Sequence, residues 1–198
     1  MPLKDTGTEQ SIKDTAKHIL FAEGKLHATT QEIADAAGVN RSAVHYYFRS
    51  RDQLIAAVFV EAMNALSERL DQCMESPLPF REKVERLISV FLDDMISYPY
   101  QETFLVTEIN TLGKHLLGNL GTGPVHSFLE EIAAEMERGS IQKMEPINFF
   151  MNLFSLLSYP LIMAPLYREL FQINEKNYQE LAIGRKKMIL NMIFNPFQ

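Results

Sequence analysis

Residues 37–54 read AGVNRSAVHYYFRSRDQL, and this stretch differs in charge from the rest of the chain. It holds three arginines and one aspartate, whereas the whole chain of 198 residues has a formal net charge of −6. Residues 1–60 carry seven basic and seven acidic side chains, so the other 138 residues carry all of the negative charge. Segregated charge of this kind indicates two parts with different tasks.

Local sequence signals place two short helices around this stretch. Thr29 and Glu32 form a capping-box pattern that predicts a helix over residues 31–37, and Gly38 ends it. Asn40 predicts the cap of the next helix, which runs to about Phe48. Two short helices joined by a tight turn are typical of a helix-turn-helix, whose second helix enters the major groove of DNA.

The outer face of the second short helix carries groups suited to DNA. Val44 and Phe48 are spaced to face the core together. On the other side, Arg41 offers charge to a phosphate or a bidentate donor pair to guanine. The hydroxyls of Tyr46 and Tyr47 suit phosphate contacts that fix the register of the protein on DNA. An ordinary polar helix face is the competing interpretation.

The stretch TTQEIADAAGVNRSAVHYYFRSRDQL, residues 29–54, resembles the DNA-binding domain of the TetR family of transcriptional regulators. The similarity extends from about Ser11 to Val58. The family commonly has Tyr-His-Tyr-Phe or Tyr-Tyr-His-Phe where residues 45–48 here are His-Tyr-Tyr-Phe, and often a serine in place of Asn40, which leaves the preferred operator open. The resemblance implies that eight positions face DNA: Thr30, Gln31, Arg41, Ser42, His45, Tyr46, Tyr47 and Arg51.

The remainder of the chain shows helical periodicity nearly throughout, with no convincing strand pair. We therefore expect an all-α fold. An N-terminal three-helix helix-turn-helix domain, residues 1–51, precedes a larger α-helical ligand-binding and dimerisation domain, residues 52–198 (about nine helices).

Residues 146–167 contain no formal charge over a length that could span a membrane. Asparagines, serines and two internal prolines dilute the segment, and a helix buried on several sides explains it as well. The family resemblance implies a homodimer through its last two long helices. We expect that interface near residues 146–171 and 174–194, with kinks at Pro160 and Pro165 and no membrane partner.

The resemblance also implies a pocket for a small hydrophobic effector in the acidic part. On this basis we expect a ligand-responsive repressor that binds a palindromic operator as a dimer and that the effector releases from DNA. Ordinary core packing is the competing role for every pocket candidate. The candidates are Phe91, Met95, Phe104, Thr107, Glu108, Phe128, Phe150 and Phe154.

Several other classes of protein fit the sequence poorly. The only cysteine, Cys73, excludes an internal disulfide and favours a reducing, cytoplasmic location. No strand precedes the glycines of GNLGTG, and no histidine pair has zinc-ligand spacing, so we expect neither cofactor, metal nor enzymatic activity. A helical dimeric binding or adaptor protein that does not bind DNA remains the alternative.

Overall fold

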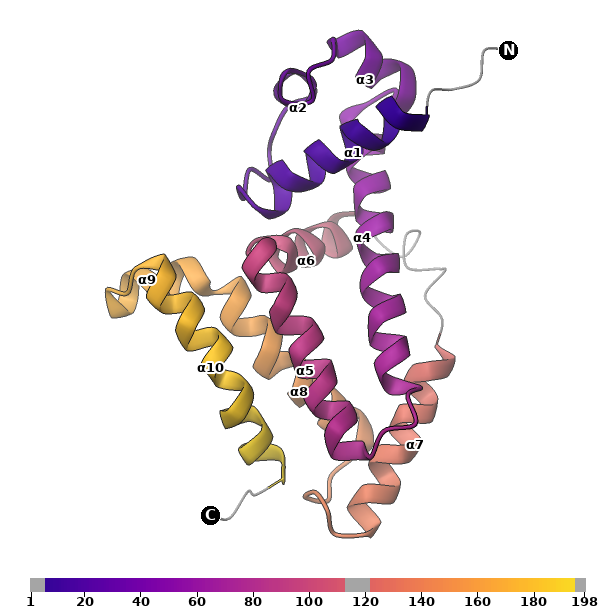
Figure 1. The fold of residues 1–198 in the computed structure, drawn as a ribbon, viewed down its shortest axis with the longest axis vertical. Coiled ribbons are helices and arrows are strands. Elements are labelled where there is room, and N and C mark those ends of the chain that lie inside the picture. Colours follow the sequence, from indigo (N-terminus) through magenta and orange to yellow (C-terminus); the bar gives the residue numbers. More distant parts are fainter. Residues whose placement is uncertain (1–5, 113–121, 195–198) are drawn as a thin grey trace. The chain divides into compact units, whose positions relative to one another are not determined.

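The computed structural model describes residues 6–112 and 122–194, apart from the side chains of residues 6, 94–96 and 112. Within these residues the chain forms ten α-helices and no strand, so the predicted all-α fold is confirmed (Figure 1). The helices are α1 (Thr6–Phe21), α2 (Thr30–Ala36), α3 (Arg41–Phe48), α4 (Arg51–Met74), α5 (Phe80–Ser97), α6 (Gln101–Leu112), α7 (Gly123–Glu137), α8 (Pro146–Ile162), α9 (Ala164–Phe171) and α10 (Glu175–Phe194).

The chain divides into two compact units. The first unit comprises Met1–Ala65 and Ser97–Asn119, and the second comprises Leu66–Ile96 and Leu120–Gln198. The helix α4 therefore begins in the first unit and ends in the second. Although α6 follows α5 in sequence, it belongs to the same unit as α1, α2 and α3.

Aromatic side chains tie α6 to the rest of the first unit. The Phe104 ring of α6 lies 4.9 Å from the Phe21 ring of α1 and 6.5 Å from the Phe59 ring of α4, measured between ring centroids. All three side chains are almost fully buried. Burying such large apolar surfaces is the main stabilising contribution of a small core, so α6 is part of this core and not an appendage.

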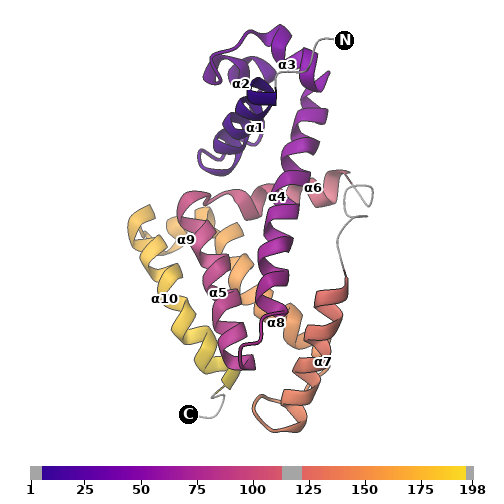
Figure 2. The same cartoon turned by 45° about the vertical axis from the view of Figure 1, so that its right-hand side comes forward.

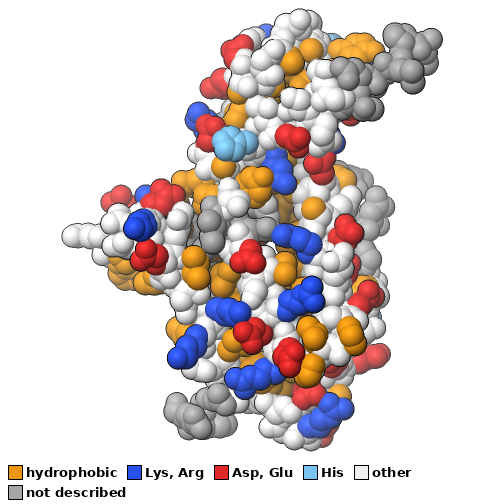
Figure 3. All heavy atoms as spheres, in the orientation of Figure 1, with side chains coloured by type: hydrophobic (Ala, Val, Ile, Leu, Met, Phe, Trp, Pro, Cys, Tyr) orange, Lys and Arg blue, Asp and Glu red, His pale blue; other side chains and the backbone are white. Residues whose placement is uncertain are grey.

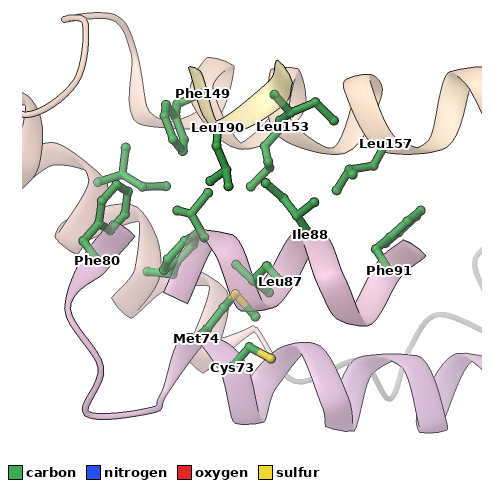
Figure 4. Close-up of a cluster of buried hydrophobic side chains, with 14 of the residues drawn as sticks. Cys73, Met74, Phe80, Leu87, Ile88, Phe91, Phe149, Leu153, Leu157 and Leu190 are labelled. Carbon is green, nitrogen blue, oxygen red and sulfur yellow. The ribbon is translucent and has the colours of Figure 1, made fainter. Parts of the chain in front are cut away.

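The core of the second unit lies among α5, α7, α8 and α10. Figure 4 shows Phe149, Leu153 and Leu157 of α8 beside Leu87 and Ile88 of α5. The spacing of four residues in α8 puts these side chains on one helix face, as amphipathic packing requires. Cys73 belongs to the same cluster, where burial raises the pKa of its thiol.

The uncharged segment is divided between two helices. The helix α8 continues through Pro160 and ends at Ile162, and α9 starts at Ala164 with its axis turned by 65°. Pro165 lies in the first turn of α9, where the missing N–H group leaves no helical bond broken. Two bends were predicted, but the chain makes one sharp change of direction.

No single helix among residues 6–112 and 122–194 has the length and apolar character needed to cross a membrane. Only the bent pair α8 and α9 passes by length and composition.

Candidate nucleic-acid interface

Side-chain hydrogen bonds cap the N-termini of α2 and α3. The Thr29 hydroxyl accepts a hydrogen bond from the Glu32 backbone N–H at 3.2 Å, and the Glu32 carboxylate accepts one from the Thr29 N–H at 2.7 Å. The predicted capping box is thus confirmed. At the start of α3, Asn40 Oδ1 accepts from the Ala43 N–H at 2.8 Å, and the Ser42 hydroxyl donates to the same oxygen at 2.6 Å. These caps hold both helix N-termini in defined positions.

The helix α3 buries one face and exposes the other. Val44 and Phe48 are buried, as their spacing predicts. Arg41, Ser42 and His45 are exposed, and Tyr46 is 47% exposed. Tyr47 is half-buried, and its ring meets that of Tyr46 edge to face with 5.1 Å between the centroids. The exposed face is thereby partly pre-ordered by aromatic contact.

A hollow of about 230 Å³ lies where α2, α3 and the start of α4 meet. We call it the cationic hollow, because the described residues that line it include three arginines and no acid. Four of the predicted DNA-facing residues meet there: Thr30, Arg41, His45 and Arg51. Arg49, Ser50 and Val44 complete the lining. Its size and charge suit an anionic group such as a phosphate.

Arg51 makes contacts inside the first unit. Its Nε donates to the Ala28 carbonyl at 2.7 Å, and one terminal nitrogen donates to the Leu26 carbonyl at 2.6 Å. Ala28 directly precedes Thr29, the cap of α2. The guanidinium therefore holds the loop before α2 against the start of α4, in addition to lining the cationic hollow.

Gln31 and Thr30 differ in their surroundings. Gln31 is exposed, and its side-chain nitrogen donates to Asp35 Oδ1 at 2.7 Å along the same helix. Thr30 is half-buried at the first position of α2 and lines the cationic hollow. Of these two predicted residues, only Thr30 lies beside the arginines.

Arg49 is a further candidate, outside the eight positions predicted to face DNA. It lies between α3 and α4 with φ +63° and ψ −42°, and the Ser50 N–H donates to the Phe48 carbonyl at 2.7 Å across it. This geometry is a γ-turn with positive φ, which is strained for any residue with a Cβ atom. The available signal was a basic residue in a tight turn beside the second short helix.

Acidic and basic side chains alternate over the face of the second unit shown in Figure 3. The cationic hollow differs from that pattern, because its charged lining residues all have one sign.

A family profile matches part of the sequence of the first unit. The profile describes bacterial regulatory proteins of the tetR family, and it matches residues 12–58. These residues therefore form a tetR-family domain.

Curated relatives of this chain are named as transcriptional regulators. It is 32% identical over 81 residues to the HTH-type transcriptional regulator BetI of Rhizobium meliloti, covering 41% of this chain and 40% of the relative. It is 30% identical over 129 residues to the HTH-type transcriptional dual regulator CecR of Shigella flexneri, covering 58% of each. The similarity therefore spans only about half the length of these relatives.

A likeness of fold extends over nearly the whole chain. The transcriptional regulator FadR of Bacillus subtilis, solved in complex with stearoyl-CoA, superposes with a TM-score of 0.65. The superposition covers 96% of this chain and 100% of that one, at 15% sequence identity. At this identity the likeness shows the shared fold alone.

The predicted effector-pocket residues are distributed over both units. In the first unit, Phe104 is buried and the Thr107 hydroxyl donates to the Thr103 carbonyl at 2.7 Å. Burial raises the pKa of Glu108, which lies in the field of Arg51 and Asp52. These three candidates lie in α6.

The other candidates belong to the second unit. Phe91 and Phe128 are buried in its core. Phe150 and Phe154 are half-buried, with 4.6 Å between their ring centroids. Met95 lies in α5, but its side chain is outside the described ones.

A furrow of about 430 Å³ runs along α8 in the second unit. We call it the α8–α10 furrow, because Phe149, Asn152, Leu156 and Tyr159 of α8 line it together with Met192 and Ile193 of α10. None of the eight predicted pocket residues lines this furrow. Among residues 6–112 and 122–194, no group of three His, Cys, Asp or Glu side chains could hold a metal ion.

Proposed function

We propose that this protein is a cytoplasmic, ligand-responsive transcriptional repressor that binds a palindromic operator as a homodimer and is released by a small hydrophobic effector. The single observation that carries the DNA-binding part is the cationic hollow beside the exposed face of α3. A helix of this kind places its N-terminal side chains against base edges, while nearby cations and helix N-termini hold the phosphates.

The residues divide into two proposed roles on DNA. Arg41, His45 and Tyr46 are exposed on α3, and we assign them to base edges or to the groove wall. Thr30, Tyr47 and Arg49 lie at the edge of that surface, and we assign them to phosphates. Ser42, Gln31 and Arg51 complete the proposed surface, although each also has a hydrogen-bond partner within the protein.

Dimerisation is supported by apolar side chains that the second unit leaves exposed. The helix α8 buries Phe149 and Leu157 on one side, and it exposes Ile147, Met151 and Tyr159 on the opposite side. A helix that is apolar on opposite sides needs a second partner. Ten of the twelve large exposed hydrophobic residues in the described part of the chain belong to α8, α9 and α10: Ile147, Met151, Tyr159, Leu166, Leu170, Phe171, Leu181, Ile183, Met188 and Met192.

Ligand control is supported by the size and composition of the chain beyond the DNA-binding helices. The FadR structure with stearoyl-CoA is an example of this fold holding a ligand with a long apolar chain. We propose that a small hydrophobic effector binds among the aromatic pocket candidates of the second unit, Phe91, Phe128, Phe150 and Phe154. The effector would prefer the conformation with wrongly spaced recognition helices. A coupling of roughly 1–3 kcal/mol would change operator affinity about 5- to 150-fold.

Mobility-shift titrations with the DNA upstream of the protein's own gene test the proposal. We expect specific binding that falls steeply as salt rises, because cations on the protein displace counterions from DNA. Arg41→Ala should weaken binding without changing the unfolding midpoint. If binding to every upstream fragment equals binding to random DNA, the protein is instead a helical binding or adaptor dimer.

Calorimetry tests the control by an effector. Once a ligand is found by thermal-shift screening, its affinity is measured with and without the operator. Linkage requires that the operator weaken ligand binding by the same factor by which the ligand weakens operator binding. Equal ligand affinities in the two titrations would leave a DNA-binding dimer without ligand control.

A further inference from the structure

We infer that the Ser42 hydroxyl reads an exocyclic amino group of DNA, because its only proton is already donated to Asn40. This base preference rests on the proposed function and adds to it a selective position in each half of the operator. It follows from the direction of two hydrogen bonds at the start of α3.

The chemistry of the Asn40 side chain decides which atom donates in each bond. The Ala43 backbone N–H can only donate, so the Asn40 atom that lies 2.8 Å from its nitrogen is the amide oxygen, Oδ1. The same oxygen lies 2.6 Å from Ser42 Oγ. An amide oxygen carries no hydrogen, so the Ser42 hydroxyl is the donor of this second bond. Serine has one hydroxyl proton, and Ser42 therefore has only lone pairs left for another partner.

The cap of α3 holds this arrangement in place. Asn40 is the N-cap residue, and Ser42 is at the second helical position. A contact in which Ser42 donates to DNA must first break the 2.6 Å bond, whereas a contact in which it accepts leaves that bond intact. A hydroxyl that already donates is also polarised to accept more strongly. The difference is about one hydrogen bond, which corresponds to a roughly two- to tenfold difference in affinity.

Ser42 lies on the exposed side of α3, in its first turn. His45 and Tyr46 are three and four positions further on, so they share this side of the helix. Val44 and Phe48 are on the buried side, and α3 contacts both α1 and α2 (Figure 2). The N-terminal residues of a recognition helix are the ones that contact base edges in the major groove. Ser42 is therefore placed to meet a base.

A hydroxyl that can only accept is selective among the bases. In the major groove the hydrogen-bond donors are the N4 amino group of cytosine and the N6 amino group of adenine. Guanine presents N7 and O6 there, and thymine presents O4, all of which are acceptors. A free serine hydroxyl can serve either kind, but Ser42 favours adenine or cytosine on the strand that it faces. Asn40 is a positioning residue, because it sets this preference through Ser42.

Phosphate oxygens are also acceptors, so the same bond disfavours a phosphate contact by Ser42. Its neighbour Arg41, which lines the cationic hollow, carries donors only. The first turn of α3 thus presents a donor and an acceptor side by side.

Selection from a library of random duplexes tests the preference. We expect the parent protein to select, in each half-site, a position with adenine or cytosine on one strand. Ser42→Ala should accept the four bases more evenly at that position and keep the preferences at the others. If the position that Ser42→Ala relaxes holds guanine or thymine on the strand that Ser42 faces, the inference is wrong.

Changes to single groups of the DNA identify that strand and the contact. In the selected duplex, purine replaces adenine, or 2-pyrimidinone replaces cytosine, so that only the exocyclic amino group is removed. The affinity of the parent protein should fall roughly two- to tenfold, as expected for one hydrogen bond. The affinity of Ser42→Ala should not respond. An equal fall in the two proteins would contradict a contact between Ser42 and the amino group.

Two variants of Asn40 separate the base preference from helix capping. Asn40→Asp keeps an oxygen that accepts from both Ala43 and Ser42, whereas Asn40→Gly removes this oxygen but remains a tolerated N-cap. Both variants lose the amide nitrogen. The preference is the ratio of dissociation constants on duplexes that differ at the one position, and circular dichroism checks that each variant is folded.

We expect Asn40→Asp to keep this ratio, although its negative charge weakens binding to all sequences. Asn40→Gly should lower the ratio roughly two- to tenfold, because the freed hydroxyl can also donate. An unchanged ratio in Asn40→Gly would overturn the role of Asn40.

The outcomes separate this inference from the proposed function. If the parent protein selects no sequence over random DNA, both the proposed DNA binding and the base preference fail. If it binds a selected sequence but gives any of the contradicting results above, only the inference about Ser42 and Asn40 fails.

Discussion

The ring of Tyr100 lies against Gly24 so closely that it occupies the space of a side chain there. A Cβ atom on Gly24 would be 2.9 Å from two ring carbons of Tyr100, and Gly24 has φ +69°. The Tyr100 N–H also donates to the Phe21 carbonyl at 2.9 Å. The end of α1 and the start of α6 are thus joined by a ring, a glycine and a backbone hydrogen bond.

Gly24→Ala should therefore lower the free energy of unfolding. The left-handed backbone alone costs an alanine about 1–2 kcal/mol, and the clash with Tyr100 adds to this. Urea denaturation gives the difference. Gly38→Ala is the control, since Gly38 has φ +67° with nothing within 4 Å of the added Cβ. Equal losses in the two variants would show that Tyr100 moves aside freely.

Arg51→Ala should destabilise the first unit. The variant leaves the Ala28 and Leu26 carbonyls without their donors, and hydrogen bonds to a charged group contribute about 1.5–3 kcal/mol. Arg51→Lys keeps the charge, but its single ammonium nitrogen lacks the planar arrangement of donors with which the guanidinium reaches both carbonyls. This variant should therefore recover only part of the lost free energy of unfolding. Arg41→Ala, on the exposed face, should leave unfolding unchanged. Full recovery of stability by lysine would contradict a role that depends on fork geometry.

Arg49→Gly should have opposite effects on stability and on DNA binding. Glycine relieves the positive φ, which should raise the free energy of unfolding by about 1 kcal/mol after its own entropy cost. Loss of the guanidinium should weaken binding to all DNA sequences and reduce the salt dependence by about one counterion. Gln172→Gly, at the other non-glycine residue with positive φ in the described part of the chain, should stabilise without affecting DNA. Unchanged DNA affinity in Arg49→Gly would remove Arg49 from the interface.

Gly184 lies in the exposed apolar stripe of α10, between Leu181 and Met188. Nothing lies within 4 Å of a Cβ atom added there, so Gly184→Ala should stabilise the helix by about 1 kcal/mol. Gly184→Phe should raise the dimer dissociation constant, because a large ring blocks close approach of a second copy. Light scattering over a dilution series measures the constant. Gly123→Phe, at another open glycine, should leave it unchanged. A dimer dissociation constant that Gly184→Phe leaves unchanged would place the interface elsewhere.

Stability should fall in acid partly through the capping box. The backbone hydrogen bond from Thr29, and then its hydroxyl, lower the pKa of Glu32 below its ordinary value of 4.5. A carboxylate with a lowered pKa stabilises the folded state above the ordinary value, and that contribution is lost as pH falls through the lowered pKa. Thermal unfolding from pH 7 to pH 3 should show a smaller acid loss in Glu32→Gln than in the parent. If the unfolding temperatures of the two proteins fall in parallel with pH, the Glu32 carboxylate makes no net contribution to stability.

Local signals predicted much of the first unit. The capping pattern at Thr29 predicted a helix over residues 31–37, and α2 spans Thr30–Ala36. Asn40 predicted the start of the helix that the structure forms as Arg41–Phe48. These signals act within four residues, so the sequence contains them directly.

Other features depend on residues that are distant in sequence. No local sequence pattern predicts the hydrogen bonds of Arg51, because they reach carbonyls 23 and 25 positions away. The prolines predicted bends in the uncharged segment, but the donors that fix the bend come from Tyr178 and Arg185. The packing of α6 with α1 follows from rings that meet only in the folded chain.

The bend after α8 also imposes an order on synthesis. The ribosome synthesises residues 146–162 before it adds Tyr178 and Arg185. The Leu156 and Pro160 carbonyls therefore lack their side-chain donors until the nascent chain has grown to α10. Until then α8 can pack against α5 and α7 but lacks the cover that α10 provides. Exposed apolar surface of this kind makes a nascent chain bind chaperones or aggregate. A chain stopped before residue 175 should therefore accumulate in the insoluble fraction. The final packing of α8 therefore requires α10 to be synthesised first.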